Sequence, residues 1–492
     1  MKNSLWTLLI AVAASSCATT PPERQAVADA AEALGGRQKI LAIKTLTIEG
    51  EGASPNVGQN TMPDSELPVW KVTEFKRIID FANGRMRTRQ LRTAQFLFAN
   101  ANTQRQDQGL DAEVAYNVGT DGMAARASAN TMQDRRIEML HNPIAIVRAV
   151  LDQPTATVSG LRTAQNQQIV EIKTAKGEML TLAIDATTKL PTRVTSMGYN
   201  ANMGDVAIDT AFLDYQDVGG VKLPTHFITK IDKYLQFDLK VTKNTLDEAG
   251  VAADLTAPDA VRSAEVPPAI PPVVVTVEPV AKGIWWLAGS GNHRSVVFEF
   301  DNHLTLFETP VNEARSKAVI DKARTLSSKP LTQAVVSHHH FDHSGGLRVA
   351  VAEGLTIITY KANEEFFKDL VARRHTVVAD ALAKNPQPLK IVLVDDAMTM
   401  KDNSMEVQLF HLRDNPREGT NLFAYVPRDR ILVQADLYDS TWMYHYWGEN
   451  VITNIEKIRK LRVDKQVPIH GAIQSYREMV KTIRAKPGPP KD

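Results

Sequence analysis

The chain has 492 residues, 43% of them hydrophobic, which is enough to bury substantial cores in two to four domains. Its 57 Lys and Arg residues balance 56 Asp and Glu residues, so the charge gives no support for a nucleic-acid partner or a polybasic membrane patch. Cys17 is the only cysteine, and the chain therefore cannot form an internal disulfide.

The N-terminus has the shape of a secretory leader. An apolar run from Leu5 to Ala14 follows Met1-Lys2-Asn3 and is too short to span a bilayer as a mature helix. The stretch just before Cys17 resembles the site at which bacterial lipoproteins are cleaved and lipidated. We therefore predict a signal peptide over residues 1–17 and an exported protein. It is either periplasmic or anchored to the outer membrane as a lipoprotein, with a lipid on Cys17 as its only membrane contact.

The next part of the chain predicts a β-rich domain over residues 25–250. An Ala-rich helix is expected from Glu23 to Leu34, ended by Gly35-Gly36, and a second helix at Asn142–Leu151, where Pro143 suits the first turn. Short alternating segments bounded by turn residues predict strands. These are Ile43–Glu49, Val72–Phe81, Arg85–Arg92, Gln168–Lys173, Met179–Ile184, Pro191–Met197, Val206–Tyr215 and His226–Ile231.

Two stretches of this domain, Leu182–Arg193 and Asp214–Pro224, have a turn-and-strand pattern similar to that of outer-membrane lipoprotein-sorting and carrier proteins. The resemblance implies a curved antiparallel β half-barrel whose concave face could hold an acyl chain. A β-domain that only packs beside a catalytic site is the alternative.

A proline-rich segment separates this domain from the rest. Val266–Pro272 contains four prolines that stiffen the backbone, so we predict a linker over residues 251–272 and a second domain over 273–485. A chain that begins near Val273 is expected to fold on its own. Its predicted strands are Val273–Val280, Gly283–Leu287, Ser295–Phe300, Leu331–Val336, Ile391–Val394, Glu406–Phe410, Leu422–Val426, Ile431–Gln434 and Val467–Ile469. Its predicted helices are Asn312–Leu326, Asn363–Ala372, Asn450–Leu461 and Ile473–Ile483.

A dense group of metal-ligating residues follows the apolar run Leu331–Val336. His338, His340, Asp342 and His343 fall within six residues, in a chain with 12 histidines in all. A buried strand that ends in a glycine-bounded loop carries such side chains to a sheet edge. Imidazole and carboxylate donors suit zinc, and also iron or manganese, and leave positions open for water. A fortuitous His-rich surface loop is the alternative.

The string His338-x-His340-x-Asp342-His343 matches the signature of the metallo-β-lactamase superfamily. Ile431–Leu437 resembles the family strand whose closing Asp bridges two metals, and Val467–Gly471 resembles the strand that supplies the last His. The resemblance implies an α+β chain in which a four-layer αββα sandwich follows the half-barrel. The implied metal ligands are His338, His340, Asp342, His343, Asp436 and His470.

The chain departs from the family pattern at two positions. Glu308 stands where the family usually has an Asp, which is a conservative change. Before the strand Asn421–Pro427 the family places a third His for its first metal, and here Arg417 occupies that position. Arg417 could be a fixed cation that replaces a metal ion or binds an anionic substrate. His411, six residues earlier, is either the missing ligand or a plain strand-end residue.

These residues predict a metal-dependent hydrolase of the cell envelope that holds one or two zinc ions, with iron or manganese as alternatives. A bound metal lowers the pKa of water from about 15.7 to about 7, and Asp342 is the catalytic residue expected to orient that water or carry its proton. The expected substrate is a small molecule with an ester, lactone, amide or phosphoester bond.

Two other functions remain open from the sequence. One is an iron-binding redox enzyme on the same fold. The other is a non-catalytic, lipid-binding lipoprotein with a degenerate metal site. His293, in a glycine-rich hairpin, and His445, in an aromatic cluster, are possible substrate contacts, and a surface loop or packing role is the alternative for each.

Overall fold

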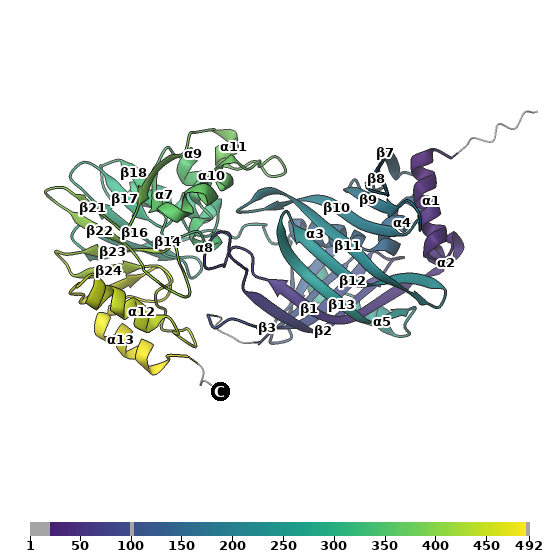
Figure 1. The fold of residues 1–492 in the computed structure, drawn as a ribbon, viewed down its shortest axis with the longest axis horizontal. Helices are drawn as coiled ribbons and strands as arrows, with labels where there is room; N and C mark the ends of the chain where they lie inside the picture. The colour runs from purple at the N-terminus through teal and green to yellow at the C-terminus, as the bar shows by residue number, and fades with distance from the viewer. Residues whose placement is uncertain (1–19, 99–102, 489–492) are drawn as a thin grey trace, which may run out of the picture.

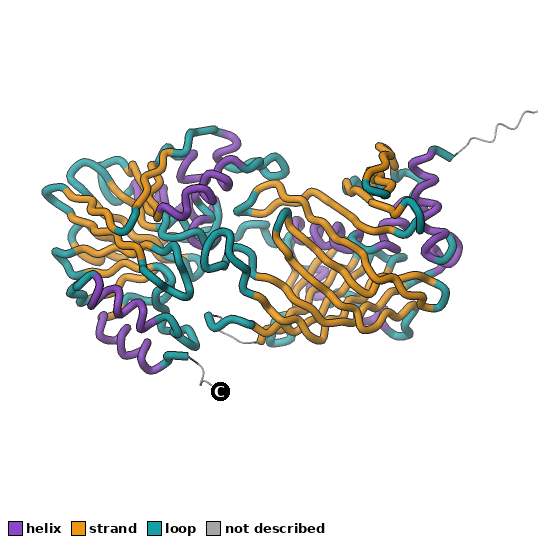
Figure 2. The backbone as a smooth tube through the Cα atoms, in the orientation of Figure 1, coloured by secondary structure: helices purple, strands orange, loops and turns teal. Residues whose placement is uncertain are grey.

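The protein is described here by a computed structural model that covers residues 20–98 and 103–488. The predicted leader, residues 1–17, lies outside the described residues. The chain forms two β-rich halves side by side, and helices account for much less of the backbone than strands do (Figures 1 and 2). The expected α+β class is confirmed. Within the described ranges, no helix has the length and apolar character needed to cross a membrane.

The N-terminal half is built on one antiparallel sheet of 13 strands. The chain lays down β1 to β6 outward from one side, passes through two helices, and returns as β7 to β13, so that β13 pairs with β1 and the sheet edges are β6 and β7. The strands are β1 (Thr45–Pro55), β2 (Val69–Asp80), β3 (Arg85–Ala94), β4 (Thr103–Asp111), β5 (Val114–Val118), β6 (Ala124–Arg126), β7 (Thr157–Ala164), β8 (Gln167–Lys173), β9 (Met179–Asp185), β10 (Pro191–Asn200), β11 (Gly204–Val218), β12 (Val221–Ile231) and β13 (Tyr234–Leu246).

Helices cover part of this sheet. They are α1 (Pro22–Leu34), α2 (Arg37–Ala42), α3 (Ala129–Leu140) and α4 (Pro143–Leu151). Helix α4 begins where expected because Asn142 accepts hydrogen bonds from the backbone N–H groups of Ile144 and Ala145. The apolar faces of α1 and α4 share one core with the strands, in which Val27, Leu34 and Val147 are fully buried.

The segment expected to be a linker, 251–272, begins with two short helices that belong to the first half. Helix α5 (Val251–Asp254) packs against Ile78, and α6 (Asp259–Ser263) packs against Tyr116. Arg262 pairs with Asp111 of β4. The stretch without helix or strand is therefore shorter, from 264 to 274.

The C-terminal half contains two sheets. The first has seven strands in the order β14 (Val275–Ala281), β15 (Ile284–Gly289), β16 (Ser295–Glu299), β17 (Leu304–Phe307), β18 (Leu331–Val335), β19 (Thr356–Tyr360) and β20 (Lys390–Val394). The second has six, β21 (Ala397–Lys401), β22 (Glu406–His411), β23 (Leu422–Val426), β24 (Ile431–Gln434), β25 (Lys465–Pro468) and β26 (Gln474–Ser475). A core with buried residues from both sheets, among them Phe298, Phe307, Val407 and Val433, shows that the sheets pack face to face.

Helices lie on the outer faces of both sheets. Those packed near the first sheet are α7 (Glu313–Arg324), α8 (Phe341–Ser344), α9 (Leu347–Ala352), the 3₁₀ turn Lys361–Asn363, α10 (Glu364–Ala372) and α11 (Ala381–Lys384). Those near the second sheet are α12 (Gly448–Thr453), which continues as a π-helical turn over Asn454–Ile458, and α13 (Tyr476–Ala485).

The two halves share a core. Met203, Val206 and Ile231 of the first half are buried in the same cluster as the helices outside the first sheet of the second half. Arg373 pairs with Asp232 and donates to the carbonyl of Met203. The connection between β1 and β2 also crosses to the second half and reaches the region of α8 (Figure 1).

Candidate metal centre

The candidate ligands lie at the carboxyl ends of two pairs of parallel strands. In the first sheet β17 runs parallel to β18, so Glu308 and His338 follow neighbouring strand ends. In the second sheet β24 runs parallel to β25, so Asp436 and His470 do the same. Because the sheets pack face to face, these four strand ends meet along one edge of the sandwich.

Local geometry fixes the turns that carry the ligands. Asp436 adopts φ of 57°, a left-handed conformation that Asp tolerates better than most residues. The side chain of Gln434 stabilises this turn by accepting from the backbone N–H groups of Leu437 and Tyr438. After the His-rich loop, a Cβ on Gly346 would lie 1.9 Å from Ser316 Oγ, so glycine allows the close approach of α7 at this point.

Three donor atoms converge on one point, and we call them the second donor group. His343 Nε2 lies 3.0 Å and His470 Nε2 3.1 Å from Asp436 Oδ1, and the two nitrogens are 3.1 Å apart. Asp342 Oδ2 lies 3.5 Å and 3.7 Å from the same two nitrogens. Ligands about 2.0 Å from a tetrahedral zinc ion are separated by about 3.3 Å, so these spacings fit such an ion.

The hydrogen bonds on the far side of both rings fix their tautomers. His470 Nδ1 lies 3.0 Å from the carbonyl oxygen of Asn292, which can only accept. His343 Nδ1 lies 3.2 Å from a carboxylate oxygen of Glu308. When each Nδ1 donates its proton, both Nε2 atoms are left unprotonated and face each other. Two lone pairs at this distance need a proton or a metal cation between them, and a carboxylate or carbonyl behind each ring is the usual support of a metal-binding His.

Three other atoms also converge: His338 Nε2, His340 Nδ1 and Asp436 Oδ2. We call them the first donor group, because its histidines come first in the sequence. The two nitrogens lie 3.8 Å and 3.7 Å from the carboxylate oxygen. Among the described residues, neither nitrogen has a hydrogen-bond partner, although both are fully buried. Asp436 therefore presents one oxygen to each group, as a bridging carboxylate would.

Glu418 is a residue of this centre that the sequence analysis missed. Its Oε2 lies 2.6 Å from His340 Nε2 and 3.9 Å from His338 Nε2. This oxygen is buried and has no conventional hydrogen bond to any described residue. Asn415 shapes the loop by accepting from the backbone N–H groups of Arg417 and Glu418. Its position in the sequence could have indicated this, because Glu418 directly follows Arg417, where a third histidine was expected.

Arg417 faces the centre beside Glu418. Its Nη2 donates to Asp436 Oδ2 at 3.1 Å and to the amide oxygen of Gln59 at 2.9 Å. The ring of Phe98 lies 3.8 Å from its guanidinium carbon. A buried, fixed cation therefore stands next to the first donor group.

The centre carries an excess of buried negative charge. Burial would raise the pKa values of Asp342, Asp436 and Glu418, but the neighbouring histidines hold all three well below their ordinary values. Burial would lower the pKa of His343, yet the carboxylates of Asp342, Asp436 and Glu308 raise it well above its ordinary value. The cluster therefore attracts positive charge, either as protons or as a metal cation.

The other candidate histidines have different surroundings. His411 Nε2 lies 3.0 Å from the carbonyl of Gly419, and its ring stacks on Tyr360 at 3.8 Å, so His411 points to neither donor group. His293 Nε2 lies 3.1 Å from Asp342 Oδ2, at the edge of the second donor group. His445 is buried, with its Nε2 2.9 Å from the carbonyl of Asp439.

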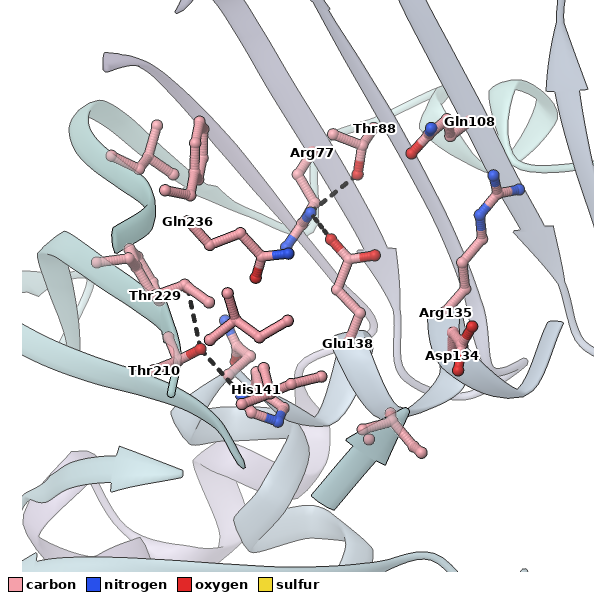
Figure 3. A pocket seen from close by; sticks show the side chains of 18 of the residues that line it. Arg77, Thr88, Gln108, Asp134, Arg135, Glu138, His141, Thr210, Thr229 and Gln236 are labelled. Carbon is pink, nitrogen blue, oxygen red and sulfur yellow. Dashed lines mark hydrogen bonds and ion pairs between the residues drawn. The ribbon is translucent and has the colours of Figure 1, made fainter. Parts of the chain in front are cut away.

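A separate hollow of about 550 Å³ lies in the N-terminal half, between the sheet and α3. Figure 3 shows Arg77 next to Thr88 and Glu138 on one side and His141 next to Thr210 on the other. Apolar side chains line much of the remainder, including Ile48, Phe75, Ile208, Phe227, Phe237 and Leu239.

Comparison with known proteins gives distant similarity. No family model matches the chain. A linear primary-alkylsulfatase from Pseudomonas sp. (strain ATCC 19151) is 20% identical over 229 residues, which cover 38% of this chain and 43% of that protein. The chain thus spans less than half the length of this relative.

Several solved structures resemble part of the chain. A metallo-beta-lactamase from Pontibacter korlensis is 14% identical, with a TM-score of 0.34, over 43% of this chain and 98% of its own. A metallo-beta-lactamase from Hirschia baltica is 16% identical, with a TM-score of 0.34, over 44% of this chain and 99% of its own. A metal-soaked Flv1 flavodiiron core from Synechocystis sp. PCC6803 is 15% identical, with a TM-score of 0.36, over 44% of this chain and 61% of its own.

Proposed function

We propose that this protein is a metal-dependent hydrolase whose centre lies at the edge of the C-terminal sandwich. The observation that carries the proposal is the second donor group, in which two imidazole nitrogens face each other at 3.1 Å beside a shared carboxylate oxygen. A proton on His343 satisfies only part of that arrangement, whereas a divalent cation takes all three donor atoms as ligands at once.

The residues have distinct roles in this proposal. His343, His470 and Asp436 would hold one metal ion, with Asp342 beside them. His338 and His340 would hold a second ion together with Asp436, and Glu418 would support His340 from its opposite ring nitrogen, Nε2. The depressed pKa values of the carboxyl groups keep these donors ionised at neutral pH.

Zinc fits the donor set best, and iron and manganese accept the same ligands. Such an ion would lower the pKa of a bound water to about 7 and polarise a substrate oxygen. The chain itself orients the reaction through Asp342, whose carboxylate is held ionised and faces His343, His470 and His293. We assign Asp342 as the residue that orients the attacking water and takes its proton.

The proposed substrates are small molecules with an ester, lactone, amide or phosphoester bond. Sulfate esters join this set because the Pseudomonas relative is named as an alkylsulfatase. The buried positive charge of Arg417 beside the first donor group is suited to an anionic ester.

The test combines metal analysis with a substrate panel. We expect purified protein to contain zinc by mass spectrometry and to hydrolyse at least one of p-nitrophenyl acetate, phosphate and sulfate or a simple lactone, with activity lost after chelation and restored by zinc. Asp436→Asn should lose both metal and activity, while Asp395→Asn, an exposed change on the same half, should lose neither. Protein without a tightly held metal and without hydrolysis would contradict the proposal.

The architecture and location are part of the same proposal. The C-terminal half corresponds to a four-layer αββα sandwich of the metallo-β-lactamase type, supported by the two facing sheets and their outer helices.

The sequence of residues 1–17 supports export with a lipid on Cys17. If Cys17→Ala leaves membrane attachment and processing unchanged in cells, the lipid anchor is wrong.

The hollow in the N-terminal half supports a second candidate function, which is binding of an amphiphilic molecule such as a lipid. Its volume of about 550 Å³ lies within the usual range of about 300–1,000 Å³ for ligand sites, and its lining combines apolar side chains with Arg77 and Glu138. A fluorescent fatty acid should bind wild type, and Ile208→Trp, which fills the hollow, should weaken that binding. Equal binding by both proteins would contradict this function.

A further inference from the structure

The loop between β1 and β2, residues 56–68, leaves the N-terminal sheet and ends at the metal centre. Three of its backbone carbonyls contact the second half. Asn60 O lies 2.9 Å from His340 Nε2, Thr61 O accepts from the N–H of Gly419 at 2.9 Å, and Gly58 O accepts from the N–H of Phe341 at 3.3 Å. The loop thereby touches both the His-rich segment and the segment that carries Glu418.

The sequence of the loop is built for this position. Gly58 has φ of 78°, and a Cβ there would lie 2.2 Å from the ring of Phe341, so a larger residue would push the loop out. Asn60 is 4% exposed, and its amide donates to the carbonyls of Met62 and Pro63 at 2.5 Å and 2.9 Å. These contacts hold the tip of the loop in one shape.

Gln59 stands between the two donor groups. Its amide nitrogen donates to Asp342 Oδ1 at 2.8 Å, and its amide oxygen accepts from Arg417 Nη2 at 2.9 Å. The same Nη2 donates to Asp436 Oδ2 at 3.1 Å. One amide head therefore joins the carboxylate at the second donor group to the cation beside the first. A carboxylate at position 59 could not make both bonds, because it has no donor for Asp342.

We propose that Gln59 is a positioning residue of the metal centre, and that the N-terminal half completes this centre by inserting the loop 56–68. The inference rests on the proposed function. By binding Asp342 Oδ1, Gln59 leaves Oδ2 directed at His343 and His470. By binding Arg417, it fixes the cation that pairs with Asp436. Groups that orient a ligand in this way contribute about 10–100-fold to metal affinity.

The test uses the full chain loaded with Co²⁺, whose visible absorption reports ligand geometry. Gln59→Leu removes both hydrogen bonds, and Gln59→Glu keeps the shape but sets a carboxylate against Asp342. We expect both variants to bind Co²⁺ about 10–100-fold more weakly and to show altered visible bands, with Gln59→Glu at least as impaired as Gln59→Leu. Glu66→Gln, an exposed change in the same loop, is the control and should match wild type.

The outcomes separate this inference from the proposed function. Wild type that fails to bind Co²⁺ would contradict the proposed function itself. Wild type that binds Co²⁺ while both Gln59 variants keep its affinity and spectrum would overturn the role of Gln59 alone. If Gln59→Leu does not fold, as judged by circular dichroism, Gln59→Glu decides the matter, because its side chain has the same shape.

Discussion

The Nε2 atoms of His343 and His470 lie 3.1 Å apart, while the Nδ1 atom of each ring faces a hydrogen-bond acceptor on the opposite side. The acceptors come from distant parts of the chain, Glu308 after β17 and Asn292 in the hairpin before β16. In the neutral form of each ring, these acceptors thus favour the tautomer that a metal ion requires.

Removing one of these nitrogens is expected to abolish metal binding at the second donor group. In His470→Gln the side chain reaches about as far, but its amide nitrogen only donates hydrogen bonds and has no lone pair for a metal. We expect the tightly held ion to be lost and hydrolysis to fall by more than about a hundredfold, measured by metal stoichiometry and initial rates. His303→Gln replaces a histidine far from the donor groups and serves as the control. Full metal content in His470→Gln would show that His470 is not a ligand.

The first donor group is expected to depend on Glu418 rather than on His411. Glu418→Gln keeps the shape but removes the charge next to His340, so its second ion should bind about 10–100-fold more weakly. His411→Ala should leave metal content unchanged, because its Nε2 faces the carbonyl of Gly419. Isothermal titration with Zn²⁺ measures both effects. Loss of an ion in His411→Ala, with none in Glu418→Gln, would reverse the assignment.

Arg417→His is expected to raise the metal content toward a second ion per chain. The change replaces the cation that pairs with Asp436 by a neutral donor beside His338 and His340. It also removes the partner of the amide oxygen of Gln59. Metal analysis after dialysis checks the result. An unchanged or lower content would mean that Arg417 supports the first donor group rather than displacing an ion from it.

Most C-terminal strands could be predicted because they are short apolar runs buried between the sheets, whereas β19, β21 and β26 were not predicted. The predicted strands β23 and β24, for example, contain only buried residues. The N-terminal strands were harder, since β4 (Thr103–Asp111) is polar and pairs through side chains, as in the bidentate contact of Arg87 with Asp107. Helix α3 was missed for the same reason, because only Arg135 and Leu140 among its residues are buried.

The structure brings the six candidate ligands together at strand ends, four of them from one closely spaced motif. Glu418 was missed because an imidazole was expected in its loop, although a carboxylate is an equally good donor. Gln59 carried no signal, since it lies 283 residues from Asp342 in the sequence. Its contact depends on how the two halves pack, which local patterns do not encode.

Acid is expected to destabilise the N-terminal half through His141. Burial lowers the pKa of this imidazole to about 4, and its two nitrogens face Thr210 and Ser196. Between the ordinary value of 6.5 and about 4, the unfolded chain binds a proton that the folded chain does not, so stability falls as pH falls. The full effect is about 3 kcal/mol. In His141→Gln the unfolding free energy should depend less steeply on pH over this window. Equal slopes in denaturant titrations would contradict the assignment.

A chain that begins at Val273 is expected to fold but to bind metal more weakly than the full chain. Its core between the two sheets is intact, whereas it lacks Gln59 and the buried contacts of Met203 and Val206. Burial of one apolar side chain stabilises a fold by roughly 1.5–3 kcal/mol. Side chains that Met203 and Val206 cover in the full chain lose part of this stabilisation, so the melting temperature should drop. Weaker metal binding should follow from the freed carboxylate of Asp342. Calorimetry and Zn²⁺ titration check both effects, with full-length Gln59→Leu as the matched comparison. If the shortened chain binds metal as tightly as the full chain, the N-terminal half contributes nothing to the centre.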